Sequence, residues 1–155
     1  MHRPGRSAPA WDRGLTLTEM LMVIVIVAIL VAATGPRIVP ILARAGAGQA
    51  ASLVATDLEQ AVSLASRQRR PVRVACDCAN GTYTITDRGN GTVLFHRVVV
   101  GGSGDFGLNS MAFSTPQVDI FPSGQTSAPL TVSLTASDVT RQVSMSTGGF
   151  VRVIR

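Results

Sequence analysis

The longest hydrophobic run of the chain covers residues 15–33 and contains a single charged side chain, that of Glu19. At 1.5 Å per residue this run would form a helix about 28 Å long, which is close to the thickness of the hydrocarbon core of a bilayer. The run therefore predicts a single membrane-spanning helix. A carboxylate in such a segment is unfavourable and usually has a partner or a function, which makes Glu19 a candidate functional residue.

Residues 35–70 predict a continuation of this helix. Pro36 predicts a kink or short break, because proline removes a backbone donor and clashes with the preceding turn. Gly46 and Gly48 predict added flexibility. Helical spacing then resumes, and the apolar positions that fall on one stripe are Val54, Leu58, Ala61, Val62 and Ala65. We expect this stripe to pack against a globular head and the helix to end before Pro71.

The pattern changes to alternation with period two in residues 71–155, which predicts a β-rich head. Asn80-Gly81 is a strong signal for a hairpin turn, and Asn90-Gly91 is a second turn signal. Strands are expected at residues 72–78, 82–87, 93–100, 111–114, 118–121, 130–135, 141–146 and 150–154. Short connections favour antiparallel pairing, so we expect two small sheets, or one curled sheet, against the helix.

Charge adds only a modest constraint. The net charge is +5, but three arginines precede the hydrophobic run, and removal of residues 1–14 would leave eleven arginines against eight acids. This excess is weak support for nucleic-acid binding. A basic leader before an apolar run allows a plain single-pass anchor, a secretory signal peptide or a prepilin-type segment. Glu19 argues against the signal peptide, whose apolar region has no use for an acid.

The residues around Glu19 favour the prepilin-type segment. Gly14-Leu15-Thr16-Leu17-Thr18-Glu19 resembles the cleavage and methylation motif of type IV pilins and of the pseudopilins of type II secretion. The resemblance implies cleavage after Gly14 by a prepilin peptidase and N-methylation of Leu15, although the usual first mature residue is Phe. It also implies that the Glu19 carboxylate pairs in the fibre with the terminal amine of a neighbouring subunit, and that Pro36 bends the helix.

The C-terminal half is similar to the GspH/FimT family, which contains the H-type minor pseudopilins of type II secretion and related minor type IV pilins. The segments that carry the resemblance are residues 120–124, 130–134 and 141–151. It implies a pilin-like α+β fold, in which a long N-terminal hydrophobic helix packs on an antiparallel β-sheet or sandwich head. The family commonly ends its last turn with Gly-Arg, whereas here Gly149 precedes Phe150 and an arginine follows only at Arg152.

No constellation of residues indicates catalysis, a cofactor or a metal site, so we expect a protein that is not an enzyme. Cys76 and Cys78 lie on one face of an expected strand, where side chains two apart are too distant for a disulfide without a bend. Buried free thiols are therefore favoured over the disulfide that an oxidising periplasm would permit. Two cysteines without a nearby histidine do not make a zinc site, and no nucleophile motif lies near His96.

Six arginines are candidates for contact with a partner or with DNA: Arg67, Arg69, Arg70, Arg73, Arg152 and Arg155. The favoured interpretation is a solvated face with ion pairs to Asp57, Glu59 or Asp77. The alternative is capture of the DNA backbone, as in minor pilins of uptake systems. Aromatic side chains that could stack on bases are sparse, so binding of single strands is disfavoured.

These observations predict a leader peptide at residues 1–14, a transmembrane and fibre-core helix at 15–34, a helix continuation with a Pro/Gly kink at 35–70, and a periplasmic head at 71–155. The expected function is that of a minor pseudopilin, a structural subunit of the pseudopilus tip held in the inner membrane by a single pass. Its expected partners are other minor and major pseudopilins, the prepilin peptidase and the inner-membrane assembly platform. The alternatives are a FimT-like minor pilin in pilus priming or DNA uptake, and an unrelated membrane-anchored β-domain.

Overall fold

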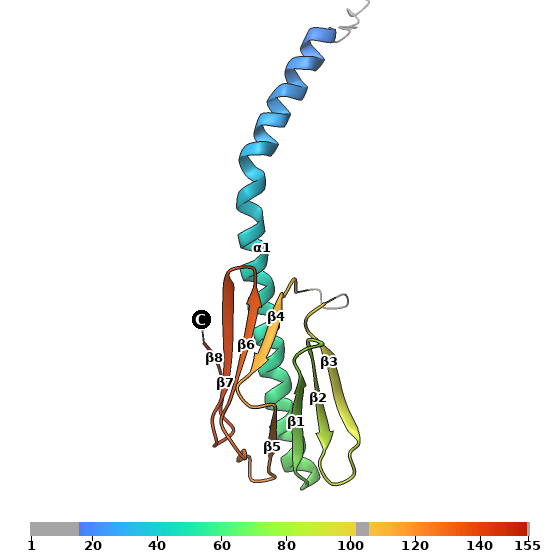
Figure 1. Cartoon of the computed structure of the whole chain (residues 1–155), viewed down its shortest axis with the longest axis vertical. Coiled ribbons are helices and arrows are strands. Elements are labelled where there is room, and N and C mark those ends of the chain that lie inside the picture. Colours follow the sequence, from blue (N-terminus) through green and yellow to red (C-terminus); the bar gives the residue numbers. More distant parts are fainter. Residues whose placement is uncertain (1–15, 102–105, 155) are drawn as a thin grey trace, which may run out of the picture. The chain divides into compact units, whose positions relative to one another are not determined.

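The structure is a computed structural model that describes residues 16–101 and 106–154; within its helix, the side chains of residues 34–39 are not described. One helix is followed by eight strands (Figure 1), which confirms the predicted α+β class. The elements are α1 (Leu17–Gln68), β1 (Val72–Asp77), β2 (Thr82–Asp87), β3 (Val93–Val98), β4 (Ser110–Phe113), β5 (Gln117–Ile120), β6 (Leu130–Ala136), β7 (Val139–Met145) and β8 (Val151–Ile154). The chain divides into two compact units, Met1–Arg37 and Ile38–Arg155, which are described separately.

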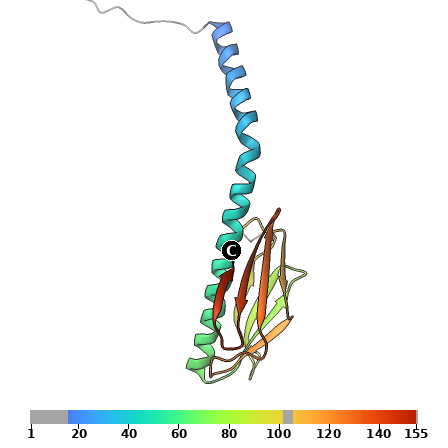
Figure 2. The same cartoon turned by 90° about the vertical axis from the view of Figure 1, so that its left-hand side faces the viewer.

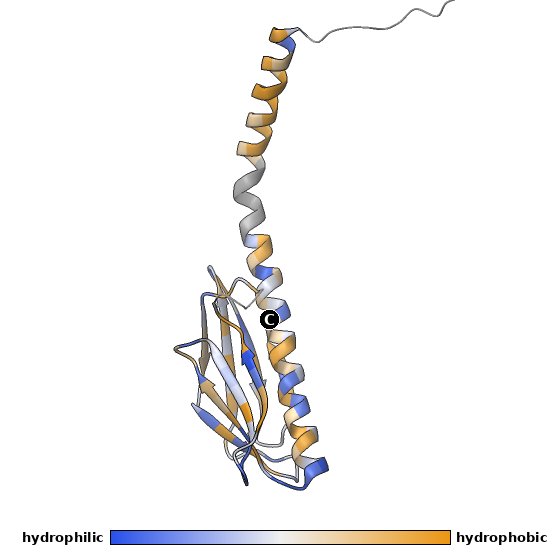
Figure 3. Ribbon diagram, turned by 90° about the vertical axis from the view of Figure 1, so that its right-hand side faces the viewer, coloured by the Kyte–Doolittle hydropathy of each residue, from blue (hydrophilic) through white to orange (hydrophobic). Residues whose placement is uncertain are grey.

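In the first unit, α1 begins at Leu17 after the N-cap residue Thr16. The Glu19 N–H donates to the Thr16 carbonyl at 3.1 Å and to Thr16 Oγ1 at 3.3 Å, which satisfies a donor that a helix start leaves unpaired. The helix is apolar along residues 20–33 (Figure 3), and its large side chains are exposed throughout. No helix in the described part of the chain is long and apolar enough to cross a membrane.

The helix assignment continues through Pro36 without interruption. The break expected there is therefore absent, because the chain keeps its helical course on both sides of the proline. A bend at Pro36 stays a prediction, because this residue lies at the boundary between the two units, which are described separately. At its other end the helix terminates as predicted before Pro71, with Arg69 in the left-handed conformation at φ 53°.

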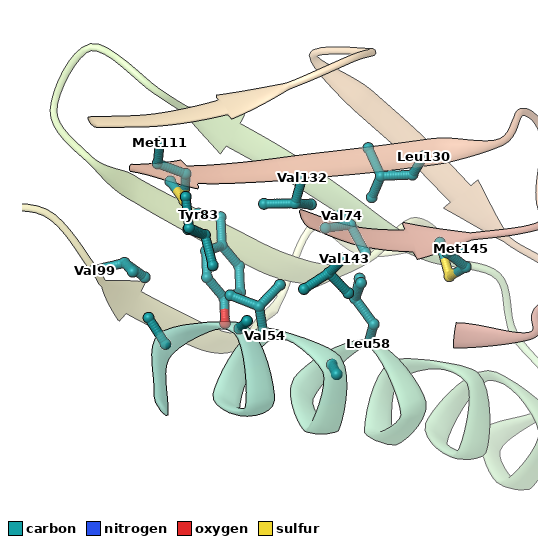
Figure 4. Close-up of a cluster of buried hydrophobic side chains, with 14 of the residues drawn as sticks. Val54, Leu58, Val74, Tyr83, Val99, Met111, Leu130, Val132, Val143 and Met145 are labelled. Carbon is teal, nitrogen blue, oxygen red and sulfur yellow. The ribbon is translucent and has the colours of Figure 1, made fainter. Parts of the chain in front are cut away.

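In the second unit, the predicted apolar stripe of α1 is confirmed as the side that faces the head. Val54, Leu58, Ala61 and Ala65 are buried, whereas the opposite positions, such as Gln60, are exposed. Figure 4 shows Val54 and Leu58 reaching up between side chains of both sheets. The fully buried positions of α1 include several alanines, which allow the strands to approach the helix closely: Ala47, Ala50, Ala51, Ala61 and Ala65.

The strands form two four-stranded antiparallel sheets, in the orders β3-β2-β1-β5 and β4-β6-β7-β8. In Figure 1 the two sheets lie side by side in front of α1, with β8 and β3 at the outer edges. The two-sheet form of the prediction is thus the correct one. Burial alternates strictly along β6, as expected for strands with one face on a core, and the observed strand ends differ from the predicted ones by at most two residues.

Gly46 is a packing position and not a flexible one, which corrects the prediction for this segment. The helix is regular here, and a Cβ built on Gly46 would overlap the carbonyl oxygen of Phe106. Only glycine lets the loop backbone approach the helix this closely. Gly48, half a turn away, differs, since a Cβ there would meet no atom within 4 Å.

The two glycines therefore predict opposite effects for the same substitution. Gly48→Ala should raise the free energy of unfolding by about 0.5–1 kcal/mol, because alanine has the higher helix propensity. Gly46→Ala should lower it by about 1–3 kcal/mol, since the new methyl group displaces backbone that cannot rotate away. Urea unfolding of the detergent-solubilised protein measures both, and equal shifts of the two midpoints would contradict this assignment.

Candidate functional site

The exposed apolar segment of α1 is the first candidate surface. Its large side chains are exposed from Leu17 (83%) to Val31 (64%), far more apolar surface than a soluble monomer normally presents. Glu19 stands at the third helical position after Thr16, the spacing of a capping box. A carboxylate in the first turn also interacts favourably with the helix dipole, so the position of Glu19 offsets part of the cost of placing an acid here.

The predicted cleavage and methylation residues, Gly14 and Leu15, lie outside the described residues. Within the described part of the chain, no arginine forms an ion pair with the Glu19 carboxylate. The predicted pairing of Glu19 with a second subunit stays a prediction.

A buried polar cluster joins α1 to the first sheet. The carboxylate of Asp57, which is 1% exposed, accepts a hydrogen bond from Tyr83 Oη at 2.6 Å. It also accepts two from Arg97, from Nε at 2.8 Å and from Nη2 at 3.2 Å. Burial and the Asp57 carboxylate raise the pKa of the Tyr83 phenol well above its ordinary value. The cluster fixes the register of the helix on the head, since every partner of Asp57 comes from β2 or β3.

This cluster corrects the sequence-based assignment of Asp57 to the arginines near the end of α1. Arg97 lies 40 residues from Asp57 and comes next to it only through the pairing of β2 with β3. The sequence of β3 contains one signal for this pair. Arg97 lies two residues after Phe95, so both side chains are on the face of the strand that packs inward. An arginine on an apolar face implies a buried acid, and Asp57 on the apolar side of α1 was the matching candidate.

Two of the six candidate arginines, Arg70 and Arg73, pair with acids of the head. Arg73 pairs with Asp119 through two hydrogen bonds, at 2.7 and 3.1 Å, and Arg70 lies 3.7 Å from Asp87. These acids replace the predicted partners Glu59 and Asp77. Arg67, Arg69 and Arg152 are exposed and form no ion pair with any residue in the described ranges, whereas Arg155 lies outside them. Contact of these arginines with DNA stays a prediction.

The Asp119 pair predicts a dependence of stability on acid pH. The hydrogen bond from Arg73 lowers the pKa of the Asp119 carboxyl below its ordinary value, with a further contribution from Arg88 at 3.4 Å. The native state therefore binds the proton less readily than the unfolded chain, so this stabilisation is present above the unfolded pKa of about 3.9 and is lost as pH falls through the folded pKa. Urea midpoints between pH 5 and pH 2.5 should fall less steeply for Asp119→Asn than for the wild type; parallel curves would contradict the assignment.

Cys76 and Cys78 form a disulfide, so the prediction of free thiols is wrong. Strand β1 ends at Asp77, and Cys78 opens the turn that leads to β2. This bend brings the two Cα atoms to 5.2 Å, within the range that a disulfide requires. Asp77 holds the same turn, because its carboxylate accepts a hydrogen bond from Asn80 Nδ2 at 2.7 Å.

The two C-terminal turns that carry the family resemblance meet in space. The Gly124 N–H donates to the Phe121 carbonyl at 2.9 Å, and a Cβ built on Gly149 would overlap the Gly124 carbonyl oxygen. Thr126, 7% exposed, links the turns, since its hydroxyl donates to the Ser146 carbonyl at 3.2 Å. Close backbone contact at this junction, with φ of +84° and +78°, explains both glycines.

No group of three or more His, Cys, Asp or Glu side chains in the described ranges could hold a metal ion. His96, near which the sequence shows no nucleophile motif, lies on the exposed face of β3.

Comparison with known proteins shows which solved structures share this architecture. No curated protein matches the sequence. The type IV minor pilin FimU of Pseudomonas aeruginosa matches the structure with a TM-score of 0.58 and 17% identity, over 72% of this chain and 90% of FimU. The minor pseudopilin EpsH of the type 2 secretion system of Vibrio cholerae matches with a TM-score of 0.58 and 18% identity, over 70% of this chain and 95% of EpsH. At these identities the likenesses establish the pilin-like fold.

The sequence itself matches two families. Residues 12–35 match the prokaryotic N-terminal methylation motif, which contains Gly14, Leu15 and Glu19. Residues 50–149 match the family described as type II transport protein GspH, and this range runs from the packed half of α1 to the last turn. Because the second match spans more than half of the chain, the chain belongs to the GspH family.

Proposed function

We propose that this protein is a minor pseudopilin of a type II secretion system, a structural subunit of the pseudopilus tip. The observation that carries the proposal is the pairing of a GspH head over residues 50–149 with a methylation motif over residues 12–35. A head alone could belong to many binding proteins, and a methylation motif alone to any pilin-like subunit. The two together indicate a subunit of a pilin-like fibre, and the match to the type II transport protein GspH favours the fibre of a secretion system.

The N-terminal segment has the properties that such a subunit needs. We infer that a prepilin peptidase cleaves after Gly14, that Leu15 is methylated, and that residues 15–34 hold the protein in the inner membrane as a single pass. The exposed apolar side chains of α1 support this, because each requires either lipid or a neighbouring helix to cover it. In the fibre, the Glu19 carboxylate would pair with the terminal amine of a neighbouring subunit and so set the axial register.

The disulfide indicates on which side of the membrane the head lies. Disulfides persist in oxidising compartments such as the bacterial periplasm and are rare in the cytosol. The Cys76–Cys78 bond therefore favours a periplasmic head. There the head would pack on other minor and major pseudopilins, and the assembly platform in the inner membrane would add or remove subunits.

The decisive experiment combines mass spectrometry with a gene deletion. Protein extracted from membranes should begin with N-methyl-Leu15, and a deletion strain should lose secretion of type II cargo until the intact gene is restored. A start near residue 34 would overturn the proposed processing, and normal secretion by the deletion strain would overturn the function.

One observation favours a second candidate function, a minor type IV pilin. FimU is as similar in fold as EpsH, with the same TM-score of 0.58. The same deletion strain separates the two functions, because loss of piliation or DNA uptake with intact secretion would favour the pilin.

A further inference from the structure

Arg141 is the feature of the head that the proposed function does not yet use. It lies in β7 on the same face as the buried Val143 and Met145, and it is opposite the buried Leu134 of β6. Its side chain is thus directed to the α1 side of the sheet and is partly buried. Within residues 16–101 and 106–154, its guanidinium has no ion pair, in contrast to Arg73 and Arg97.

A groove of about 350 Å³ surrounds Arg141 between α1 and the outer strands of the second sheet. Its lining is Gly48, Ser52, Arg141 and Val153. In Figure 2 strands β7 and β8 run beside α1 at this level. The Ser52 hydroxyl donates to the Gly48 carbonyl at 3.1 Å, so its proton is already used within the helix. Among the described residues of this lining, Arg141 is the only charged one.

No acid among the described residues lines this groove. The three least exposed carboxylates of residues 38–101 and 106–154, on Asp57, Asp87 and Asp119, are each paired with another arginine. A partly desolvated guanidinium gains most from a carboxylate, because its planar donors match both oxygens. A carboxylate carried by another molecule would supply the counter-charge that the described residues leave out.

We propose that this groove receives the carboxylate of an Asp or Glu side chain from a neighbouring pilin-like subunit, with Arg141 as its ion-pair partner. The uncharged walls at Gly48 and Val153 fit the aliphatic stem of that side chain. A nucleic-acid backbone is a poorer match, since it is held by several cations in a row, and this groove has one. The inference rests on the proposed function, because its occupant is a fibre neighbour.

The test places a photo-reactive amino acid at Thr56, which is exposed on α1 one turn beyond the groove residue Ser52, in the full-length protein within its own cells. We expect a cross-link to a pilin-like subunit at a segment that contains an acid. Arg141→Glu should reduce this cross-link about tenfold or more, and Arg141→Gln should reduce it with the fold retained, because both remove a charge pair at an interface. Reversal of the mapped acid to Arg should restore the cross-link of Arg141→Glu. Arg69→Glu, an exposed and unpaired arginine away from the groove, is the matched control.

Other outcomes overturn the inference. They are an unchanged cross-link in both Arg141 variants, a loss that reversal of the acid does not restore, and an adduct with nucleic acid in place of protein. A second photo-reactive site at Leu21, which is 58% exposed in the apolar helix, reports fibre assembly separately. If the Leu21 probe forms no cross-link to a pilin-like subunit in the otherwise wild-type protein, the proposed function fails. If it does form one, while the Thr56 cross-link is the same with and without Arg141, only the groove assignment fails.

Discussion

Replacement of Asp57 by asparagine is expected to lower the free energy of unfolding by about 3 kcal/mol, the lower end of the range for breaking a buried ion pair. The neutral amide cannot accept all three hydrogen bonds that the carboxylate accepts from Tyr83 and Arg97. Arg97 can recover part of its hydration, because its side chain is 40% exposed. The Tyr83 hydroxyl cannot, since that residue is 1% exposed. Urea unfolding of the purified protein measures the loss as a lower midpoint with an unchanged slope.

Two further variants identify the source of the effect. Tyr83→Phe removes one hydrogen bond and leaves the charge pair intact, so it should cost only about 1–2 kcal/mol. Asp138→Asn changes an exposed acid in the β6–β7 turn that forms no ion pair within the described ranges, and it should leave the midpoint within about 0.5 kcal/mol of the wild type. If Asp57→Asn were no more disruptive than Asp138→Asn, the cluster would not hold the helix on the head.

The cluster also gives the helix one preferred alignment with the head. Apart from the chain connection at residues 69–71, α1 is held to the sheets by side-chain contacts. Apolar contacts resist separation but have little directional preference, whereas the hydrogen bonds of Asp57 specify one alignment with β2 and β3. Weakening the cluster should therefore let the helix shift along the head before the sheets themselves unfold.

Most of the fold could be predicted from local pattern. Alternation of polar and apolar residues with a period of two located every strand within two residues. Asn80-Gly81 located the first hairpin, because its turn needs a positive φ, which Gly81 adopts. The stripe from Val54 to Ala65 identified the face of α1 that packs on the head. These features depend on residues close to one another along the chain.

The errors share a different origin. The partner of Asp57 depends on which strand lies opposite the helix, and the role of Gly46 depends on the path of the loop at Phe106. The Cys76–Cys78 disulfide depends on the strand ending one residue earlier than predicted, at Asp77. Each of these three features is set by tertiary contacts or by the exact residue at which a strand ends. Such boundaries are the least certain part of any prediction from sequence pattern.

Replacement of Glu19 by glutamine is expected to abolish incorporation of the subunit into the fibre. An uncompensated charge left in an apolar environment costs about 3–5 kcal/mol, which corresponds to a loss of more than about 100-fold in association. In the variant, the terminal amine of the neighbouring subunit would be the charge that loses its partner. Cross-linking at Leu21 measures incorporation directly, relative to the amount of processed subunit in the membrane.

Glutamine is the informative substitution because it separates the two roles that the geometry allows Glu19. A glutamine at the third helical position still completes a capping box with Thr16, so a residue needed only for the helix start would tolerate it. Thr16→Ala is the reciprocal control: it weakens the cap by about 1 kcal/mol but keeps the carboxylate, and it should leave assembly nearly intact. Normal assembly of Glu19→Gln together with failure of Thr16→Ala would assign Glu19 to the helix cap and remove the basis for pairing between subunits.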